Sequence, residues 1–167
     1  MERDDLLLLL GYNRWANDRV LAACRGLTPE QLLAPAAVSF TNLLGTLAHV
    51  LGSEQAWRLR LQTGVSPERM LSARDFAGLD DLEALSQREA AALRAFVESL
   101  GPDDPQRWVE YTTTSGERQG STLWRALAHL VNHGTQFRGE AGAALAVLGH
   151  SPGDLDFLLY QRETDQR

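Results

Sequence analysis

Residues 40–62 read FTNLLGTLAHVLGSEQAWRLRLQ, and this stretch decides the fold. Between Phe40 and Trp57 it contains a single charged residue, Glu54. A helix without a charged face cannot lie with one side in water, so it is buried on more than one side. We therefore predict a helix over about 40–62 that occupies a central place among other helices and ends before the helix breaker Gly64.

Three further long helices are predicted around this central one. Amphipathic patterns and terminal signals indicate helices over about 4–25, 80–100 and 121–148. Together they predict an all-α fold, an antiparallel four-helix bundle in a single domain over residues 1–167. The long connection over 63–78 permits a crossover in place of a tight hairpin.

Shorter elements are expected between and after these helices. A short helix should begin at Thr28–Pro29, and a final helical turn is expected near 154–160. Aromatic and β-branched residues over 108–119, around Ser115–Gly116, predict a short β-hairpin before the last long helix. For the helix starts we expect Ser39 or Thr41 to cap the central helix, and Asp80 with Glu83 to form a capping box.

Composition narrows the class of protein. Sixteen basic residues, all Arg, against 22 acidic ones give a formal charge of -6, which argues against nucleic-acid binding because phosphates require a basic face. The single cysteine, Cys24, excludes an internal disulfide and is expected to be a buried apolar residue. The leucine run near the N-terminus is too short for a signal peptide or a membrane span. We expect a cytoplasmic protein with no nucleic-acid and no membrane partner.

Two histidines suggest a metal site. His129 and His133 are four residues apart on the last long helix, so both project from one face and can bind one metal ion. Leu130 stands where a zinc peptidase has its catalytic Glu, which excludes that class. The same face is otherwise polar, so a solvated pair of histidines is the alternative interpretation; the other polar residues are Thr122, Arg125, Asn132, Gln136 and Glu140.

A third histidine, His49, lies in the middle of the uncharged helix. Its face carries small or polar residues: Asn42, Gly45, Gly52, Ser53 and Ala56. One interpretation is a core histidine bonded to a carbonyl or a hydroxyl. The other is a metal ligand, because packing of the two helices would bring His49 opposite His129 and His133. Three neutral imidazoles with an open position are typical of a catalytic divalent-metal site.

The remaining polar residues have weaker assignments. A metal-bound imidazole donates its other N–H to an acceptor, for which we consider Glu54, Gln136, Glu140, Asn42 and Thr122. Glu140 is the preferred carboxylate beside the site, and an exposed surface acid is the alternative. Arg125 or Arg138 could bind an anionic cofactor or be plain surface residues, and His150 is expected at the surface or at a helix end.

Several short motifs resemble one known family in their order and spacing. They are YNRWAN at 12–17 with Val20 and Leu21, TLAHVL at 46–51 with Trp57, LAHLVNH at 127–133 with QFRG at 136–139, and Gly149 with the closing Pro152, LDF at 155–157 and Tyr160. With these motifs the chain resembles the DinB/YfiT-like superfamily, the DNA-damage-inducible proteins of bacteria, over nearly its whole length.

The resemblance implies a structure and a metal centre. It implies a four-helix bundle with a long crossover, a homodimer, and one divalent ion (nickel, zinc, manganese or iron) held by the positions that match here, His49, His129 and His133. Softness rules agree with this range of metals, because an all-imidazole site accepts most first-row divalent ions.

For function, the resemblance leaves several classes open. Some relatives are thiol-dependent S-transferases that use bacillithiol or mycothiol, among them maleylpyruvate isomerase, and others are described as metal-dependent hydrolases. We therefore expect a metal-dependent enzyme of stress response or detoxification that uses a low-molecular-weight thiol on a small-molecule substrate. The alternatives are a hydrolase that uses metal-bound water, a non-catalytic metal-binding stress protein whose fourth ligand comes from the chain, and a helical bundle without metal. The sequence identifies neither a catalytic residue nor one that binds a thiol.

Overall fold

The computed structural model describes residues 1–165 and is mostly helical, with one small antiparallel sheet. The long helices are α1 (Arg3–Cys24), α3 (Leu43–Thr63), α4 (Leu79–Glu98) and α5 (Leu123–Val147). The shorter elements are the helices α2 (Pro29–Leu33) and α6 (Phe157–Asp165), the 3₁₀ turns η1 (Ala73–Asp75) and η2 (Asp104–Gln106), and the strands β1 (Trp108–Thr112) and β2 (Arg118–Thr122).

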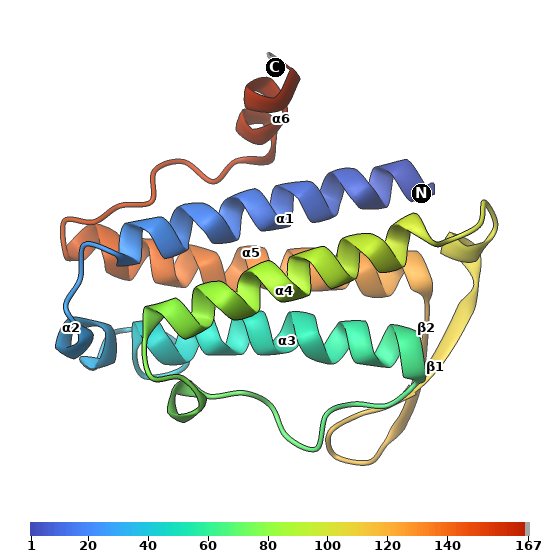
Figure 1. The fold of residues 1–167 in the computed structure, drawn as a ribbon, viewed down its shortest axis with the longest axis horizontal. Coiled ribbons are helices and arrows are strands. Elements are labelled where there is room, and N and C mark those ends of the chain that lie inside the picture. Colours follow the sequence, from blue (N-terminus) through green and yellow to red (C-terminus); the bar gives the residue numbers. More distant parts are fainter. Residues whose placement is uncertain (166–167) are drawn as a thin grey trace.

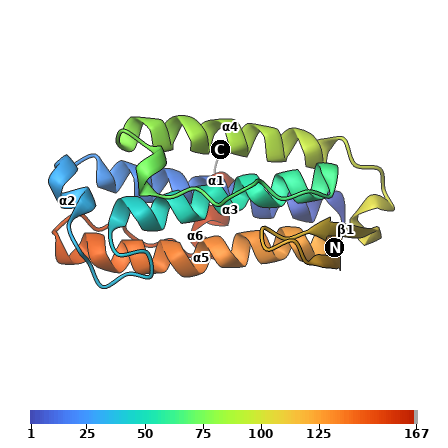
Figure 2. The ribbon, with the colours of Figure 1, turned by 90° about the horizontal axis from the view of Figure 1, so that it is seen from below.

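The four long helices lie side by side along the molecule (Figures 1 and 2). Helix α1 packs against α4 and α5, and α3 packs against the same two helices. The colours of Figure 1 show that α1 and α5 run in one direction and that α3 and α4 run in the other. The pairs α1/α4 and α3/α5 are therefore antiparallel, as expected, whereas α1/α5 and α3/α4 are parallel. The parallel pairs arise because the connection over 64–78 crosses back along the molecule before α4 begins.

The core consists of two apolar clusters, one toward each end of the helices. The cluster nearer the hairpin contains Leu6, Leu93 and Leu123, and the other contains Val20, Leu82 and Leu145. On α3 the cluster far from the hairpin ends at Leu51, and the cluster nearer the hairpin begins at Trp57. Glu54 lies between the two clusters. A polar layer in the middle of the helices thus separates the two clusters.

Two helix starts differ from the sequence predictions. Helix α3 is capped by Asn42, whose Oδ1 accepts a hydrogen bond from Gly45 N at 2.8 Å, and not by Ser39 or Thr41. The reason is the tight turn before the helix, in which Thr41 has a φ of 71° and Asn42 is the first residue with the extended backbone of a cap.

At α4 the predicted capping box of Asp80 and Glu83 is absent. The helix begins after Gly78, and Asp81 accepts a hydrogen bond from Ala77 N at 2.8 Å instead. The cap therefore lies earlier in the chain than the sequence pattern indicated, and α4 begins at Leu79.

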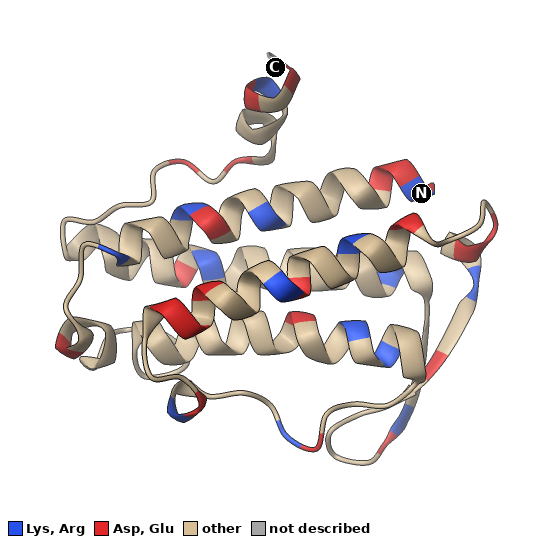
Figure 3. Ribbon diagram, viewed as in Figure 1, with Lys and Arg blue, Asp and Glu red and all other residues tan. Residues whose placement is uncertain are grey.

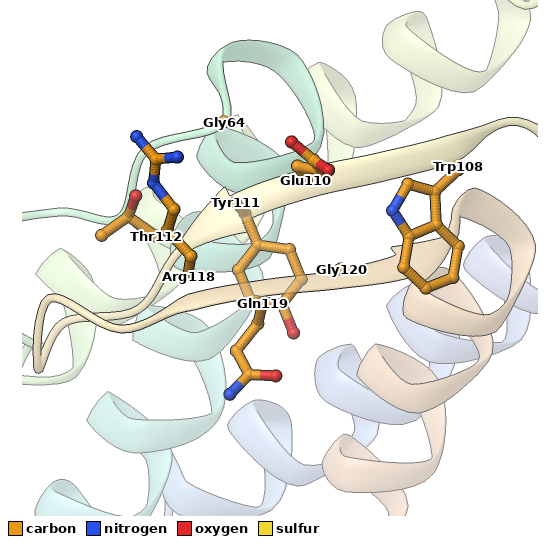
Figure 4. A pocket seen from close by; sticks show the side chains of 8 residues that line it. All are labelled: Gly64, Trp108, Glu110, Tyr111, Thr112, Arg118, Gln119 and Gly120. Atoms are coloured by element: carbon orange, nitrogen blue, oxygen red, sulfur yellow. The ribbon is translucent and has the colours of Figure 1, made fainter.

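The predicted hairpin is confirmed and is longer than expected. Strand β1 pairs with β2 from Trp108 opposite Thr122 to Thr112 opposite Arg118. Since β2 continues to Thr122, α5 begins at Leu123 and not at 121. Thr112 N donates to Gly64 O at 2.9 Å, which ties the hairpin to the end of α3. A hollow of about 550 Å³ lies over the hairpin, and its labelled lining residues include none of the predicted metal ligands (Figure 4).

The C-terminal segment docks on α1. Helix α6 runs to Asp165, beyond the turn predicted for 154–160. Tyr12 donates its hydroxyl to Leu155 O at 3.0 Å, and Trp15 Nε1 donates to Glu163 at 2.9 Å. The tail therefore closes over the aromatic side of α1. No helix within residues 1–165 combines the length and apolar character that crossing a bilayer requires.

Two leucines of α1 provide a matched test of the core. Leu6 is fully buried, whereas Leu8 is 39% exposed. We expect Leu6→Ala to lower the free energy of unfolding by about 2–5 kcal/mol, because it removes buried apolar surface and leaves a cavity. Leu8→Ala should cost below about 1 kcal/mol. Urea unfolding followed by far-UV circular dichroism measures both, and equal losses would contradict the arrangement of α1.

Candidate functional site

The structure brings two of the three predicted ligands into contact. His49 on α3 and His133 on α5 are half-buried, and their Nε2 atoms are 3.1 Å apart. Nitrogen–metal bonds of about 2.0–2.1 Å at angles between octahedral and tetrahedral would separate two ligand nitrogens by about 2.9–3.4 Å. The observed distance lies within that range. It also permits a hydrogen bond between one protonated and one unprotonated Nε2.

The third predicted ligand, His129, stands apart from this pair. It lies one helical turn before His133, its side chain is exposed, and the two ring centres are 5.8 Å apart. Its ring packs edge-on against Trp57 at 5.2 Å. No group of three donor side chains within residues 1–165 is close enough to hold one ion in this conformation. The convergence of three imidazoles therefore stays a prediction.

Aromatic rings cover one side of the histidine pair. Phe40 stacks on His49 with ring centres 3.9 Å apart and planes inclined by 21°. Phe137 packs against both His49 and His133, with a ring-centre distance of 4.7 Å to each. These two rings therefore pack against both imidazoles from the side of the turn before α3, where Phe40 itself is 38% exposed.

The environment favours the neutral form of both imidazoles. Burial lowers the pKa of His133 to about 4, and the positive charges of His49, His129 and Arg138 act in the same direction. Burial also lowers the pKa of His49, although the negative charge of Glu140 opposes this shift. Neutral imidazole is the form that binds a metal ion.

The predicted acceptors around the site have other partners or lie in solvent. Glu140 accepts from Ser39 N at 2.8 Å and from Ser39 Oγ at 2.9 Å, which anchors the turn before α3. Asn42 is the helix cap described above, and Gln136 is exposed. Thr122 precedes α5 without a capping hydrogen bond from its side chain.

Two other sequence assignments can be compared with the structure. Cys24 is fully buried, and this burial raises the pKa of its thiol to about 12, which disfavours the reactive thiolate. His150 packs at a helix end, directly on Gly26: a Cβ there would lie 2.3 Å from the His150 ring. Both residues agree with the sequence predictions.

A buried charge network joins α1, α3 and α5 beside the histidines. Glu54 Oε1 accepts from Asn13 Nδ2 at 2.6 Å and from Asn17 Nδ2 at 2.8 Å. Arg138 Nη1 donates to the carbonyl oxygens of the same two amides, at 2.6 Å and 2.9 Å. The two amides therefore connect the carboxylate to the guanidinium, and all four side chains are buried.

The sequence had placed Arg138 at the surface or beside a cofactor, and both assignments are wrong. Its side chain is 1% exposed. It lies directly against the backbone of α5, because a Cβ on Gly134 would be 2.5 Å from Arg138 Nη1. Gly134 thus makes room for the buried guanidinium. The spacing of Asn13 and Asn17, four residues apart on one face of α1, was the signal that could have revealed the network.

Loss of either charged group of the Glu54–Arg138 network would destabilise the folded protein. Burial raises the pKa of Glu54, while the hydrogen bonds from Asn17 and Asn13 and the charge of Arg138 oppose that shift. Within the part of the chain that the structure describes, Arg138 Nε has no hydrogen-bond partner. Removing either charge would leave the other buried without its counterion.

An ion pair connects α3 to α4 one helical turn after Glu54. Arg58 donates to Glu89 through Nε at 2.6 Å and through Nη2 at 3.0 Å, a two-bond geometry that raises the pKa of Arg58. Glu89 is 4% exposed. Figure 3 shows the charged bands on α3, which lie in the half of the helix toward the hairpin.

The buried network yields a prediction about stability. We expect Arg138→Met to lower the free energy of unfolding by about 3–5 kcal/mol, because Glu54 would lose its counterion. Arg125→Met, an exposed position on the same helix, should change it by less than about 0.5 kcal/mol. Combining Arg138→Met with Glu54→Leu should recover part of the loss. Chemical denaturation at pH 7 measures all three variants, and an Arg138→Met protein as stable as wild type would contradict the network.

Comparison with known proteins identifies the family. The DinB family model matches residues 1–167. Protein DinB of Bacillus subtilis (strain 168) is 23% identical over 159 residues, which cover 91% of each chain. The match extends over α1, α3 and α5, which carry the histidines and the buried network. The chain belongs to the DinB family.

Proposed function

We propose that the protein binds one divalent metal ion between α3 and α5 through His49, His133 and His129. The observation that carries this proposal is the 3.1 Å separation of the His49 and His133 Nε2 atoms. Two half-buried neutral imidazoles held at this distance offer two lone pairs to a common point. His129, one turn away and exposed, is the third ligand in this proposal.

The donor set fits a first-row divalent ion. Three neutral imidazoles leave the charge of the metal uncompensated, so the ion keeps its acidity toward a further ligand. Nickel, zinc, manganese and iron are all candidates, since imidazole binds each of them. We further propose that the four long helices form the four-helix bundle that the resemblance implies, and that two chains associate as a homodimer.

Metal content tests the site directly. Untagged protein should contain close to one metal ion per chain in elemental analysis. His49→Ala and His133→Ala should lose it, and His129→Ala should bind it more weakly. His150→Ala is the matched control, because His150 packs on Gly26 at the far end of the helices and should leave the content unchanged. Wild-type protein that stays metal-free after incubation with each of the four ions would refute the proposal.

We propose that the reaction is a thiol-dependent S-transfer in detoxification or stress response. A bound metal ion lowers the pKa of a coordinated thiol, so that the thiolate is available to attack an electrophile. The surroundings of the histidine pair favour one direction of approach for the substrate. Phe40 and Phe137 cover one side of the pair, while the exposed His129 leaves the other side open. A small molecule can therefore approach from the side of His129.

Turnover of a thiol and an electrophile tests the reaction. Metal-loaded protein should accelerate the conjugation of monobromobimane to bacillithiol or mycothiol, and His133→Ala should return the rate to the uncatalysed background. The fluorescence of the product provides the measurement, with His150→Ala as control. Ester hydrolysis that needs the metal but no thiol would favour the hydrolase instead, and a metal-loaded protein without either activity would indicate a non-catalytic role.

A further inference from the structure

Arg60, near the end of α3, differs from the other arginines of the chain. Within residues 1–165 most arginines pair with a carboxylate, and Arg138 is held by the buried amides. Those without such a partner are exposed, with one exception; the exposed ones are Arg74, Arg88, Arg118, Arg125 and Arg162. Arg60 is the exception, since it is half-buried and forms no salt bridge with a carboxylate in this range. In a chain with 22 acidic residues, a half-buried arginine without a carboxylate partner calls for an explanation.

Aromatic rings and one hydroxyl hold the Arg60 side chain in place. Its guanidinium carbon lies 4.8 Å from the centre of the Trp57 ring and 5.4 Å from that of Tyr111. Arg60 Nε donates to Ser66 Oγ at 2.8 Å, and Ser66 in turn donates to Thr112 O at 2.6 Å. The forked guanidinium of Arg60 is thus oriented before any ligand binds. Arg60 therefore loses less side-chain freedom when its guanidinium bonds to an anion.

Both Nη atoms of Arg60 are free to bind a ligand. Neither makes a hydrogen bond within the described chain, and neither is a buried atom without a partner, so both contact solvent. The Arg60 side chain is half-buried, and this burial lowers the pKa of its guanidinium, although Tyr111 opposes the shift. An oxyanion at this position would replace that water with two charge-assisted hydrogen bonds.

The position of Arg60 relates it to the histidines. The ring of His129 packs on Trp57 at 5.2 Å, and the Arg60 guanidinium packs on the same ring at 4.8 Å. The sum of these distances, about 10 Å, is the most that can separate the two groups. This separation does not exceed the length of a small organic molecule.

We propose that Arg60, with Trp57 and Tyr111, forms a binding site for the carboxylate of a small organic acid whose other end reaches His129. One planar guanidinium with two free nitrogens matches one carboxylate. The two aromatic rings favour a planar, apolar body on the ligand. This site extends the proposed function by naming the class of its substrate. Turnover of that substrate rests on the proposed metal reaction, whereas binding of the carboxylate does not.

Binding of benzoate to metal-free wild-type protein tests this site independently of the metal. In ¹⁵N-resolved nuclear magnetic resonance spectra, benzoate should cause saturable shifts of the Trp57 indole N–H and of Arg60 Nε–H. Benzyl alcohol, the neutral analogue, should not shift either signal. Chelator in the buffer separates the outcome from that of the metal proposal, since benzoate binding requires none of the histidine ligands.

Variants of Arg60 decide between a binding role and a structural one. We expect Arg60→Gln to weaken benzoate binding tenfold or more, and Arg60→Lys to weaken it less, because lysine keeps the charge but not the fork. Arg88→Gln removes one exposed, unpaired charge on α4 and should leave the affinity unchanged. Absence of saturable shifts in wild type, or equal affinity in Arg60→Gln, would refute the site. Inorganic phosphate shifting the same signals as strongly as benzoate would overturn the carboxylate assignment. Should Arg60→Gln not fold, the wild-type titration and Arg60→Lys still give the answer.

Discussion

The connection of Glu54 to Arg138 through two asparagines is the constraint on which the middle of the structure depends. His49 and His133 lie at one level on antiparallel helices, and Glu54 and Arg138 each follow their histidine by five residues. At 1.5 Å per residue the two charged residues start about 7.5 Å from that level, in opposite directions along the helices. A direct salt bridge would have to span both intervals. Asn13 and Asn17 on α1 lie between the two charged groups. This geometry explains why Glu54 and Arg138 each bond to the amides and not directly to one another.

This network also fixes the register of three helices. The two apolar clusters on either side of it would tolerate sliding of one helix past another, since leucine packs against leucine in many registers. A buried carboxylate and a buried guanidinium do not tolerate it, because a shift by one turn would leave both without partners. The network therefore holds α3 against α5 in the one register that brings His49 and His133 together. Gly134, directly after His133, contributes because a side chain there would displace Arg138.

Much of this was predictable from sequence, and the failures have physical causes. The uncharged helix around His49, the hairpin and the positions of the four long helices follow from hydrophobic periodicity and turn chemistry, which are local. The parallel direction of α3 and α4 depends on the path of the 64–78 connection: its length permits a crossover, but no local pattern determines that path. Arg138 was misplaced because an arginine is almost never buried unless it is paired, and its partners lie more than a hundred residues away on α1. Arg60 was missed for the opposite reason: an arginine near a helix end is ordinary, and only the packing of Trp57 and Tyr111 distinguishes it.

The two sides of the histidine pair differ in the residues that surround them. On the side of the turn before α3, Phe40 stacks on His49, and Glu140 anchors that turn through Ser39. Toward the hairpin, His129 is exposed and Trp57 connects it to Arg60. In the proposed site, a ligand approaching from the hairpin side would meet Arg60 beside Tyr111, whereas one approaching from the other side would meet the Phe40 ring stacked on His49. The hairpin is tied to the end of α3 through Thr112 and Gly64, so its position also sets how Tyr111 packs on Arg60. The small sheet thereby shapes the surroundings of Arg60 through Tyr111.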